Sequence, residues 1–143
     1  MSAGAITLSD INSADWSLAL DSSEGGTPGA GIGNVVQGMD DVNQCIGIIL
    51  TTPKGSDPLR PTFACDLWQY IDRPINSAVP AIVREVYNAL SLWEPRIRVL
   101  SVSAAPIAGN IAGLTVTVQW QLALGTSSSP QTATIQIPGT LNG

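Results

Sequence analysis

Residues 77–102, with the sequence SAVPAIVREVYNALSLWEPRIRVLSV, combine a predicted helix, an abrupt stop and a predicted strand, and these elements decide the fold. Apolar residues recur in the first part at the three- and four-residue spacing of a helix that packs on a core, at Val79, Ile82, Val83, Val86, Leu90 and Trp93. Ser77 is a suitable N-cap, and Pro80 lies in the first turn, where a missing N–H is tolerated. Pro95 disfavours helical backbone before it, so we expect the helix to end one or two residues earlier.

The residues after this proline predict a strand. The segment from Arg96 to Val102 is rich enough in β-branched and apolar residues to form one. Simple alternation would place Arg96 and Arg98 on the same face as Leu100 and Val102. The sequence therefore indicates either a β-bulge or a half-exposed strand end, and it leaves both open.

The chain of 143 residues carries a formal net charge of −5 and is long enough for one domain with its own core. All six basic residues lie between positions 54 and 98. Because phosphate contacts need clustered Lys and Arg side chains, this acidic chain argues against binding to nucleic acid or to an anionic membrane. No apolar run approaches the roughly 20 residues of a membrane span, and the N-terminus lacks a signal-peptide pattern, so we expect folding in a cytoplasm.

The residue types present exclude several kinds of active site. The chain has no histidine, which removes Ser–His and Cys–His nucleophiles and the commonest zinc ligand sets. Cys45 and Cys65 are too far apart in sequence for a CxxC site, and we expect two reduced thiols in the core. We therefore predict no metal site, no cofactor and no catalytic residue.

The N-terminal quarter predicts two short strands joined by a loop. Trp16, Leu18 and Leu20 alternate with small or polar residues, as in a half-buried strand. Residues 22–34 are rich in glycine and predict a loop, and a second strand near Val35 could pair back on the first. We expect one domain over residues 1–143, in which positions up to about 36 form an N-terminal extension and the glycine-rich loop.

Two further helices are predicted in the middle of the chain. Asp40 or Asp41 can cap the first, whose apolar face comprises Val42, Cys45, Ile46, Ile49 and Leu50. Pro53 and Gly55 should end it. A second, short helix ending near Asp72 should carry a compact apolar cluster of Phe63, Leu67, Trp68 and Ile71.

The C-terminal third predicts an antiparallel meander. After a small-residue loop at 104–113, residues 114–124 give the strongest alternation in the chain, and residues 132–137 alternate again after a turn. This last strand has no Lys or Glu to block further pairing, so either another chain pairs with it or the same chain covers it. The predicted fold class is α+β, with two to three helices packed on a small antiparallel sheet that ends in a C-terminal β-meander.

Ordered motifs over residues 37–102 resemble the small wedge protein of contractile-tail baseplates. This family is shared by contractile phages, tail-like bacteriocins and type VI secretion systems, and it was once labelled lysozyme-like. The motifs are the Gln44-Cys45-Ile46 helix, the Thr52-Pro53-Lys54-Gly55 turn, the Arg60-Pro61-Thr62-Phe63 turn, Asp66-Leu67-Trp68, and Glu94-Pro95-Arg96 after the long helix. Ala64 stands where the family pattern has glycine, which puts the backbone conformation of that turn in doubt.

The resemblance implies a structural role. About six copies per baseplate would clamp the helical core bundle of the larger wedge subunits and provide strands to which the first sheath ring adds. Glu94, Pro95 and Arg96 would face the wedge core, and Thr132, Thr134 and Gln136 are candidates for contact with the sheath protein. The particle would assemble in the host bacterial cytoplasm and keep the protein in its tail baseplate.

For the Glu94–Arg96 corner, the residues allow two interpretations. Both side chains point the same way if the segment is extended, and an arginine can bind a carboxylate or a helix C-terminus of a partner. Alternatively, an internal salt bridge merely stabilises the corner.

Two other functions compete with assembly. A peptidoglycan-cleaving glycoside hydrolase would need two suitably spaced carboxylates, with Asp66, Asp72, Glu85 and Glu94 as the candidates. However, Glu85 lies on the polar face of its helix. The arginines beside Glu94 should keep its carboxylate charged, whereas a general acid must carry a proton. The second alternative is a binding module unrelated to tails, and the only feature that supports it is the uncharged meander.

Overall fold

The computed structural model describes residues 14–19, 35–71, 73–123 and 129–137, which divide into two compact units, Met1–Cys45 and Ile46–Gly143. The predicted glycine-rich loop lies outside the described residues, as do Leu20 and Asp72.

The first unit contains a two-stranded antiparallel sheet, as the sequence predicts. Strand β1 (Trp16–Leu18) pairs with β2 (Val35–Gln37), with Trp16 opposite Gln37. The amide of Gln44 donates to the Ser17 hydroxyl at 2.9 Å and to the carbonyl of Leu18 at 2.8 Å, which fastens β1 to the following helix.

Helix α1 (Met39–Thr51) runs from the first unit into the second. Its first backbone hydrogen bond runs from Val42 N–H to Gly38 O, at 3.2 Å, so Gly38 occupies the capping position. The prediction that Asp40 or Asp41 is the N-cap is therefore wrong. Both residues instead lie in the first turn, where their negative charges interact favourably with the positive end of the helix dipole.

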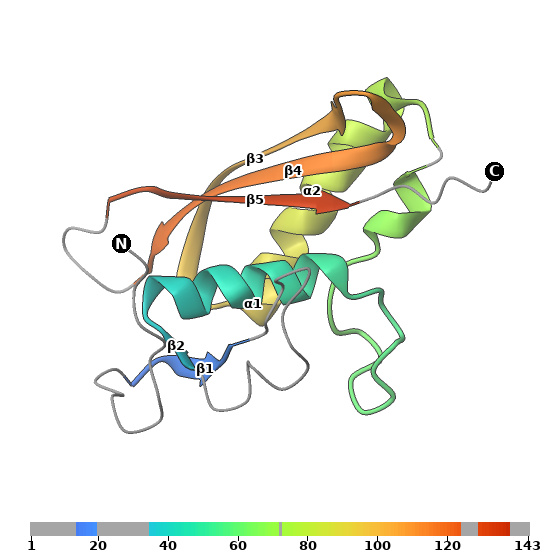
Figure 1. The fold of residues 1–143 in the computed structure, drawn as a ribbon. Coiled ribbons are helices and arrows are strands. Elements are labelled where there is room, and N and C mark those ends of the chain that lie inside the picture. The colour runs from blue at the N-terminus through green and yellow to red at the C-terminus, as the bar shows by residue number, and fades with distance from the viewer. Residues whose placement is uncertain (1–13, 20–34, 72, 124–128, 138–143) are drawn as a thin grey trace, which may run out of the picture. The chain divides into compact units, whose positions relative to one another are not determined.

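The second unit places one long helix against a three-stranded sheet (Figure 1). A short 3₁₀ helix, η2 (Leu67–Tyr70), precedes α2 (Ile75–Trp93), and β3 (Ile97–Ile107), β4 (Asn110–Leu122) and β5 (Gln131–Ile137) follow in a meander. The strand order is β3-β4-β5 and both pairings are antiparallel. The fold class is α+β, as predicted.

Helix α2 begins three residues earlier than the sequence suggests. Pro74 caps it and fixes φ before the first turn, while the Ser77 hydroxyl donates to Pro74 O at 2.9 Å from inside the helix. The prediction of Ser77 as the N-cap is therefore wrong, whereas the predicted end at Trp93 is confirmed. Of the apolar residues predicted for the core face, half are buried and half are half-buried: Ile82, Val86 and Leu90 are buried, and Val79, Val83 and Trp93 are half-buried.

The predicted loop at 104–113 is wrong, because β3 and β4 continue through it as a hairpin. Ala104 pairs with Val116 and Pro106 with Leu114, and only two residues separate the strands, the second being Gly109 with φ +82°. Small side chains have weak strand propensity, but pairing with a strongly β-forming partner strand overrides it.

A β-bulge resolves the ambiguity at the start of β3. Val99 pairs with Trp120 and Ser101 with Gln119, so Leu100 is the extra residue. Before the bulge Ile97 points to the core and Arg98 to solvent, and after it Val102 takes up the inward alternation. One of the two interpretations left open by the sequence, the bulge, is therefore confirmed.

None of the described helices combines the length and hydropathy that a membrane span requires.

Candidate functional site

The corner after α2 is a hydrogen-bonded turn. Glu94 N–H donates to Leu90 O at 2.9 Å, which closes the last helical turn, and Ile97 N–H donates to Glu94 O at 3.3 Å across Pro95. Proline pre-sets the backbone at this second position of a turn. Ala123 N–H donates to Arg96 O at 2.8 Å, so the end of β4 holds the other side of the corner.

Within this turn, Glu94 and Arg96 form an ion pair with two hydrogen bonds. Arg96 Nε lies 2.6 Å from Glu94 Oε1, and Nη2 lies 2.8 Å from Oε2. The Glu94 side chain is 5% exposed and that of Arg96 is 32% exposed. The fork geometry suits a buried carboxylate, because one planar guanidinium satisfies both oxygens.

The internal salt bridge that the sequence left open is therefore present. The side chains do point to the same side, but a turn brings them together, since the segment is not extended. Of the three predicted partner-binding residues, Glu94 is buried, Pro95 is exposed and Arg96 is half-buried. Contact of this corner with another protein stays a prediction.

Aromatic contacts connect the corner to the preceding loop. The Phe63 ring packs edge-on against Trp93, the last residue of α2, with centroids 5.1 Å apart. The guanidinium of Arg60 lies over the Phe63 ring, 4.7 Å from its centroid.

The turn that resembles the glycine-containing family pattern keeps a glycine-like backbone. Ala64 has φ +79°, is fully buried, and is the only non-glycine residue with positive φ among the described residues. Its backbone is held by its neighbours, since Phe63 N–H donates to Arg60 O at 2.9 Å and Cys65 N–H to Thr52 O at 3.4 Å.

Beyond Arg98 at the start of β3, the exposed face of the meander carries uncharged side chains. On β5, the predicted sheath-contact residues Thr132, Thr134 and Gln136 are all exposed. They lie opposite Gln119, Thr117 and Thr115 of β4, and those lie opposite Ser101, Ser103 and Ala105 of β3. The structure thus arranges nine small or uncharged polar side chains in three adjacent rows.

The two outer strands differ as edges. Strand β3 contains Pro106, which lacks an N–H, and the Leu100 bulge, and both interrupt a regular ladder. Strand β5 pairs with β4 in unbroken register from Gln131 to Ile137 and carries no proline or charge. Within the described part of the second unit, no strand pairs with its outer edge.

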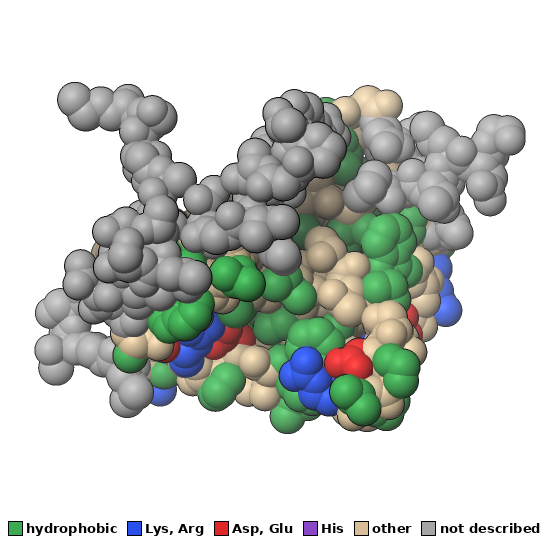
Figure 2. All heavy atoms as spheres, turned by 60° about the horizontal axis from the view of Figure 1, so that its bottom comes forward, with side chains coloured by type: hydrophobic (Ala, Val, Ile, Leu, Met, Phe, Trp, Pro, Cys, Tyr) green, Lys and Arg blue, Asp and Glu red, His purple; other side chains and the backbone are tan. Residues whose placement is uncertain are grey.

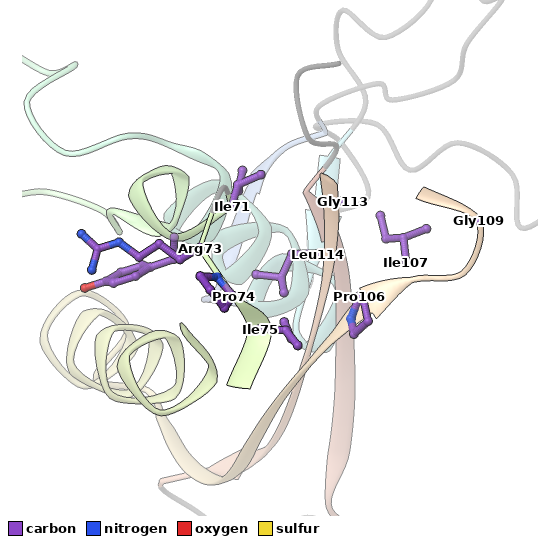
Figure 3. Close-up of a pocket in the computed structure, with 10 residues that line it drawn as sticks. Ile71, Arg73, Pro74, Ile75, Pro106, Ile107, Gly109, Gly113 and Leu114 are labelled. Atoms are coloured by element: carbon purple, nitrogen blue, oxygen red, sulfur yellow. The ribbon is translucent and has the colours of Figure 1, made fainter. Parts of the chain in front are cut away.

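An apolar pocket of about 420 Å³ lies between the η2–α2 connection and the β3–β4 hairpin (Figure 3). Its walls include Ile75, Ile107 and Leu114. Arg73 belongs to the lining too, but its guanidinium stacks over Tyr70 at 5.5 Å and extends away from these side chains in Figure 3. The described lining of this pocket offers hydrophobic contacts and contains no carboxylate.

Described carboxylates proposed for hydrolysis have structural partners. Glu85 pairs with Lys54, Glu94 pairs with Arg96, and Asp66 accepts a hydrogen bond from Gln69 at 3.2 Å. The Lys54–Glu85 pair, whose members are 31 positions apart, was not expected from the sequence. Neither member has a local sequence signal, because only the packing of the 52–66 segment on α2 brings them together.

The chain matches known proteins over most of its length. A family model described as baseplate wedge protein gp25 matches residues 36–142. Over 74 residues the chain is 35% identical to baseplate protein W of Escherichia phage P2, covering 51% of this chain and 64% of that protein. Over 66 residues it is 38% identical to baseplate wedge protein gp25 of Enterobacteria phage T4, covering 46% and 49% respectively. The match therefore spans only about half to two thirds of these relatives.

Solved structures share the fold. A Geobacter sulfurreducens protein described as a tail lysozyme superposes with a TM-score of 0.59 at 29% identity, covering 71% of this chain and 92% of that one. A chain of the type VI secretion baseplate complex superposes with a TM-score of 0.55 at 16% identity, covering 67% and 90%. The second likeness is one of fold alone. Because the family model spans residues 36–142, the chain belongs to the baseplate wedge protein gp25 family.

Proposed function

We propose that this chain is a structural component of the wedge in a contractile-tail baseplate, and not an enzyme. The family assignment and the names of the phage P2 and T4 relatives support this role. The observation that carries it here is the Glu94-Pro95-Arg96 corner, a rigid turn that holds a partly exposed guanidinium in one orientation. Such a group is preorganised for binding, because its ordering cost is met within the monomer.

In this proposal the corner docks on the helical core bundle of the larger wedge subunits. A guanidinium suits a carboxylate or the carbonyl groups at a helix C-terminus, where the helix dipole is negative. Buried Glu94 then acts as the positioning group for Arg96, and the exposed Pro95 forms part of the contact.

The same proposal assigns the meander to the sheath. An added strand from the first sheath ring would pair with the outer edge of β5 and lie beside Thr132, Thr134 and Gln136. The unbroken register of β5 and the proline and bulge in β3 favour this edge. About six copies, assembled in the host bacterial cytoplasm, would then provide a ring of such edges in the tail baseplate.

The corner is tested by replacing Arg96→Lys, which keeps a positive charge beside Glu94 but removes the fork. The matched control is Arg98→Lys, at an exposed position two residues away. We expect both variants to fold, but only R96K to lose incorporation into baseplates, by about tenfold or more. Wild-type incorporation of R96K would contradict docking through the corner.

The proposed pairing at the edge of β5 is tested by placing lysines on one or the other of the two edge strands, β5 and β3. The variant T132K/T134K puts two charges beside the outer edge of β5, and S103K/A105K puts two on the same face beside β3. We expect baseplates with the first variant to lack sheath and those with the second to be sheathed. If both assemble sheath, strand addition at β5 is excluded.

A peptidoglycan hydrolase is the second candidate, because one structural neighbour is described as a tail lysozyme. The partners of Glu85, Glu94 and Asp66 weigh against it, since a general acid must be free to donate its proton. A turbidity assay of the purified chain on bacterial cell walls distinguishes the two functions. Clearing that is lost in Glu94→Gln and Glu85→Gln variants would favour the hydrolase.

A further inference from the structure

Leu59 lies in the loop between α1 and η2 and is strongly exposed. It is 91% exposed, more than any other large hydrophobic residue that the structure describes. An exposed leucine is common by itself. Here, however, the loop that carries it is cross-linked by hydrogen bonds of its own.

Hydrogen bonds around Asp57 form the base of this loop. Its carboxylate accepts from Leu59 N–H at 2.9 Å and from Arg60 Nε at 3.2 Å, and its carbonyl accepts from Arg60 N–H at 3.1 Å. Pro58 and Pro61 restrict the backbone on both sides of Leu59 and Arg60. The loop therefore needs little further ordering on binding, which is the condition for a strong contact.

A groove of about 270 Å³ lies beside the loop, between the 61–64 turn and the last turns of α2. Its lining includes Pro61, Ala64, Leu92 and Trp93, and Leu92 is 65% exposed. Three backbone N–H groups of the neighbouring turn, those of residues 60, 63 and 65, are used inside the chain. No residue of a described strand lines the groove, so it offers side chains and not a strand edge. This suits a helix, whose backbone is already satisfied.

The ion pairs described in the second unit share one feature of exposure. In three ion pairs the basic side chain is more exposed than the acidic one, at 39% against 19%, 60% against 29% and 32% against 5% for Lys54–Glu85, Arg60–Asp57 and Arg96–Glu94. Lys54 lines the groove itself. Figure 2 shows basic and acidic side chains interspersed with hydrophobic ones on one face. In a chain of net charge −5, the basic member of each pair is thus the more exposed one, and Lys54 at the groove and Arg60 in the loop complement an acidic partner.

We propose that Leu59 and the groove beside it bind an amphipathic helix of another baseplate protein, with an apolar stripe that covers Leu59 and Leu92 and an acidic flank that meets Lys54 and Arg60. This rests on the proposed function, and it names a second contact continuous with the corner, since Trp93 of the groove precedes Glu94. The helix supplies hydrophobic contact that the corner, with its buried carboxylate, does not.

The test is co-purification of the tagged full chain with the larger wedge subunit of its own tail system, followed by titration of the two purified proteins. Leu59→Ser removes the displayed side chain, and Leu100→Ser is the matched control, an exposed leucine on β3. We expect L59S to melt like the wild type and to bind about tenfold or more weakly, with L100S within about twofold. Raising the salt concentration should weaken wild-type binding, because the charges at the rim are exposed.

The outcomes separate the two proposals. If the wild type does not bind the wedge subunit, the proposed function fails. If it binds and L59S matches L100S, the groove proposal alone is overturned. Sedimentation of the chain by itself covers the remaining occupant: a wild-type dimer that L59S dissociates would make the groove a contact between two copies and overturn the helix.

Discussion

The carboxylate of Glu94 and the guanidinium of Arg96 share two hydrogen bonds, of 2.6 and 2.8 Å, across one proline. The pair lies where α2 ends and β3 begins, and the acid is almost fully buried. Removing the base would leave that charge uncompensated, which costs far more than the pair contributes.

We therefore expect Arg96→Ala to lower the free energy of unfolding by about 3 kcal/mol. Replacing both charges, with Glu94→Gln and Arg96→Met, should cost clearly less, because no buried charge remains. Urea unfolding of the two variants measures the difference. If the single variant is no less stable than the double one, the ion pair is not what stabilises the corner.

At Ala64, we expect Gly to be tolerated and Val not. A positive φ costs an L residue about 1–2 kcal/mol, and relief of this cost in Ala64→Gly offsets the lost methyl burial and the greater flexibility of the unfolded chain. The net change should stay within about 1 kcal/mol, whereas Ala64→Val should cost more than about 2 kcal/mol, because a β-branched residue in this conformation is strained and the site is closed. Thermal unfolding of both variants would decide, and equal losses would contradict a positive φ.

Burial raises the pKa of Cys65 to about 12 from an ordinary 9.0, with a further contribution from the charge of Glu85. Because the folded chain binds the Cys65 proton more tightly than the unfolded chain, the protonated thiol contributes to the free energy of unfolding. This contribution is fully present below pH 9 and is lost as the pH rises toward 12. The change amounts to at most about 4 kcal/mol. Stability should therefore fall less steeply between pH 9 and 11 in Cys65→Ala than in the wild type.

The same thiol should resist modification at pH 8 until the chain unfolds, since the thiolate is the reactive form. Of the two cysteines, Cys65 is buried and Cys45 is half-buried. Rapid labelling of Cys65 in the native protein would show that it is accessible.

Two glycines should respond in opposite directions to alanine. Gly109 has φ +82° in the two-residue turn between β3 and β4, so Gly109→Ala should cost about 1 kcal/mol. Gly47 lies inside α1 with nothing within 4 Å of an added Cβ, so Gly47→Ala should stabilise by a similar amount of about 0.5–1 kcal/mol. Denaturant midpoints of the two variants on either side of the wild type are the expected result.

Local rules predict the parts of this fold that depend on neighbours in sequence. The period of α2 and the proline after it define where the helix ends, and strict alternation identifies β5 and most of β4. These rules gave the wrong start for both helices. Gly38 and Pro74 occupy the capping positions, although Asp40 and Ser77 have side chains that usually cap helices. A capping preference is about 1 kcal/mol, small enough for turn geometry to override it.

The sequence by itself determined the helix–proline–strand order, the uncharged last strand and the motifs of the family, because periodicity and proline act over a few residues. Only the tertiary structure decided that Glu94 is buried against Arg96, that residues 104–113 form a hairpin, and that Leu59 is displayed beside a groove. Each of these depends on chain segments that are distant in sequence or on burial, and the free energy of such contacts is fixed by packing, which residue patterns do not encode.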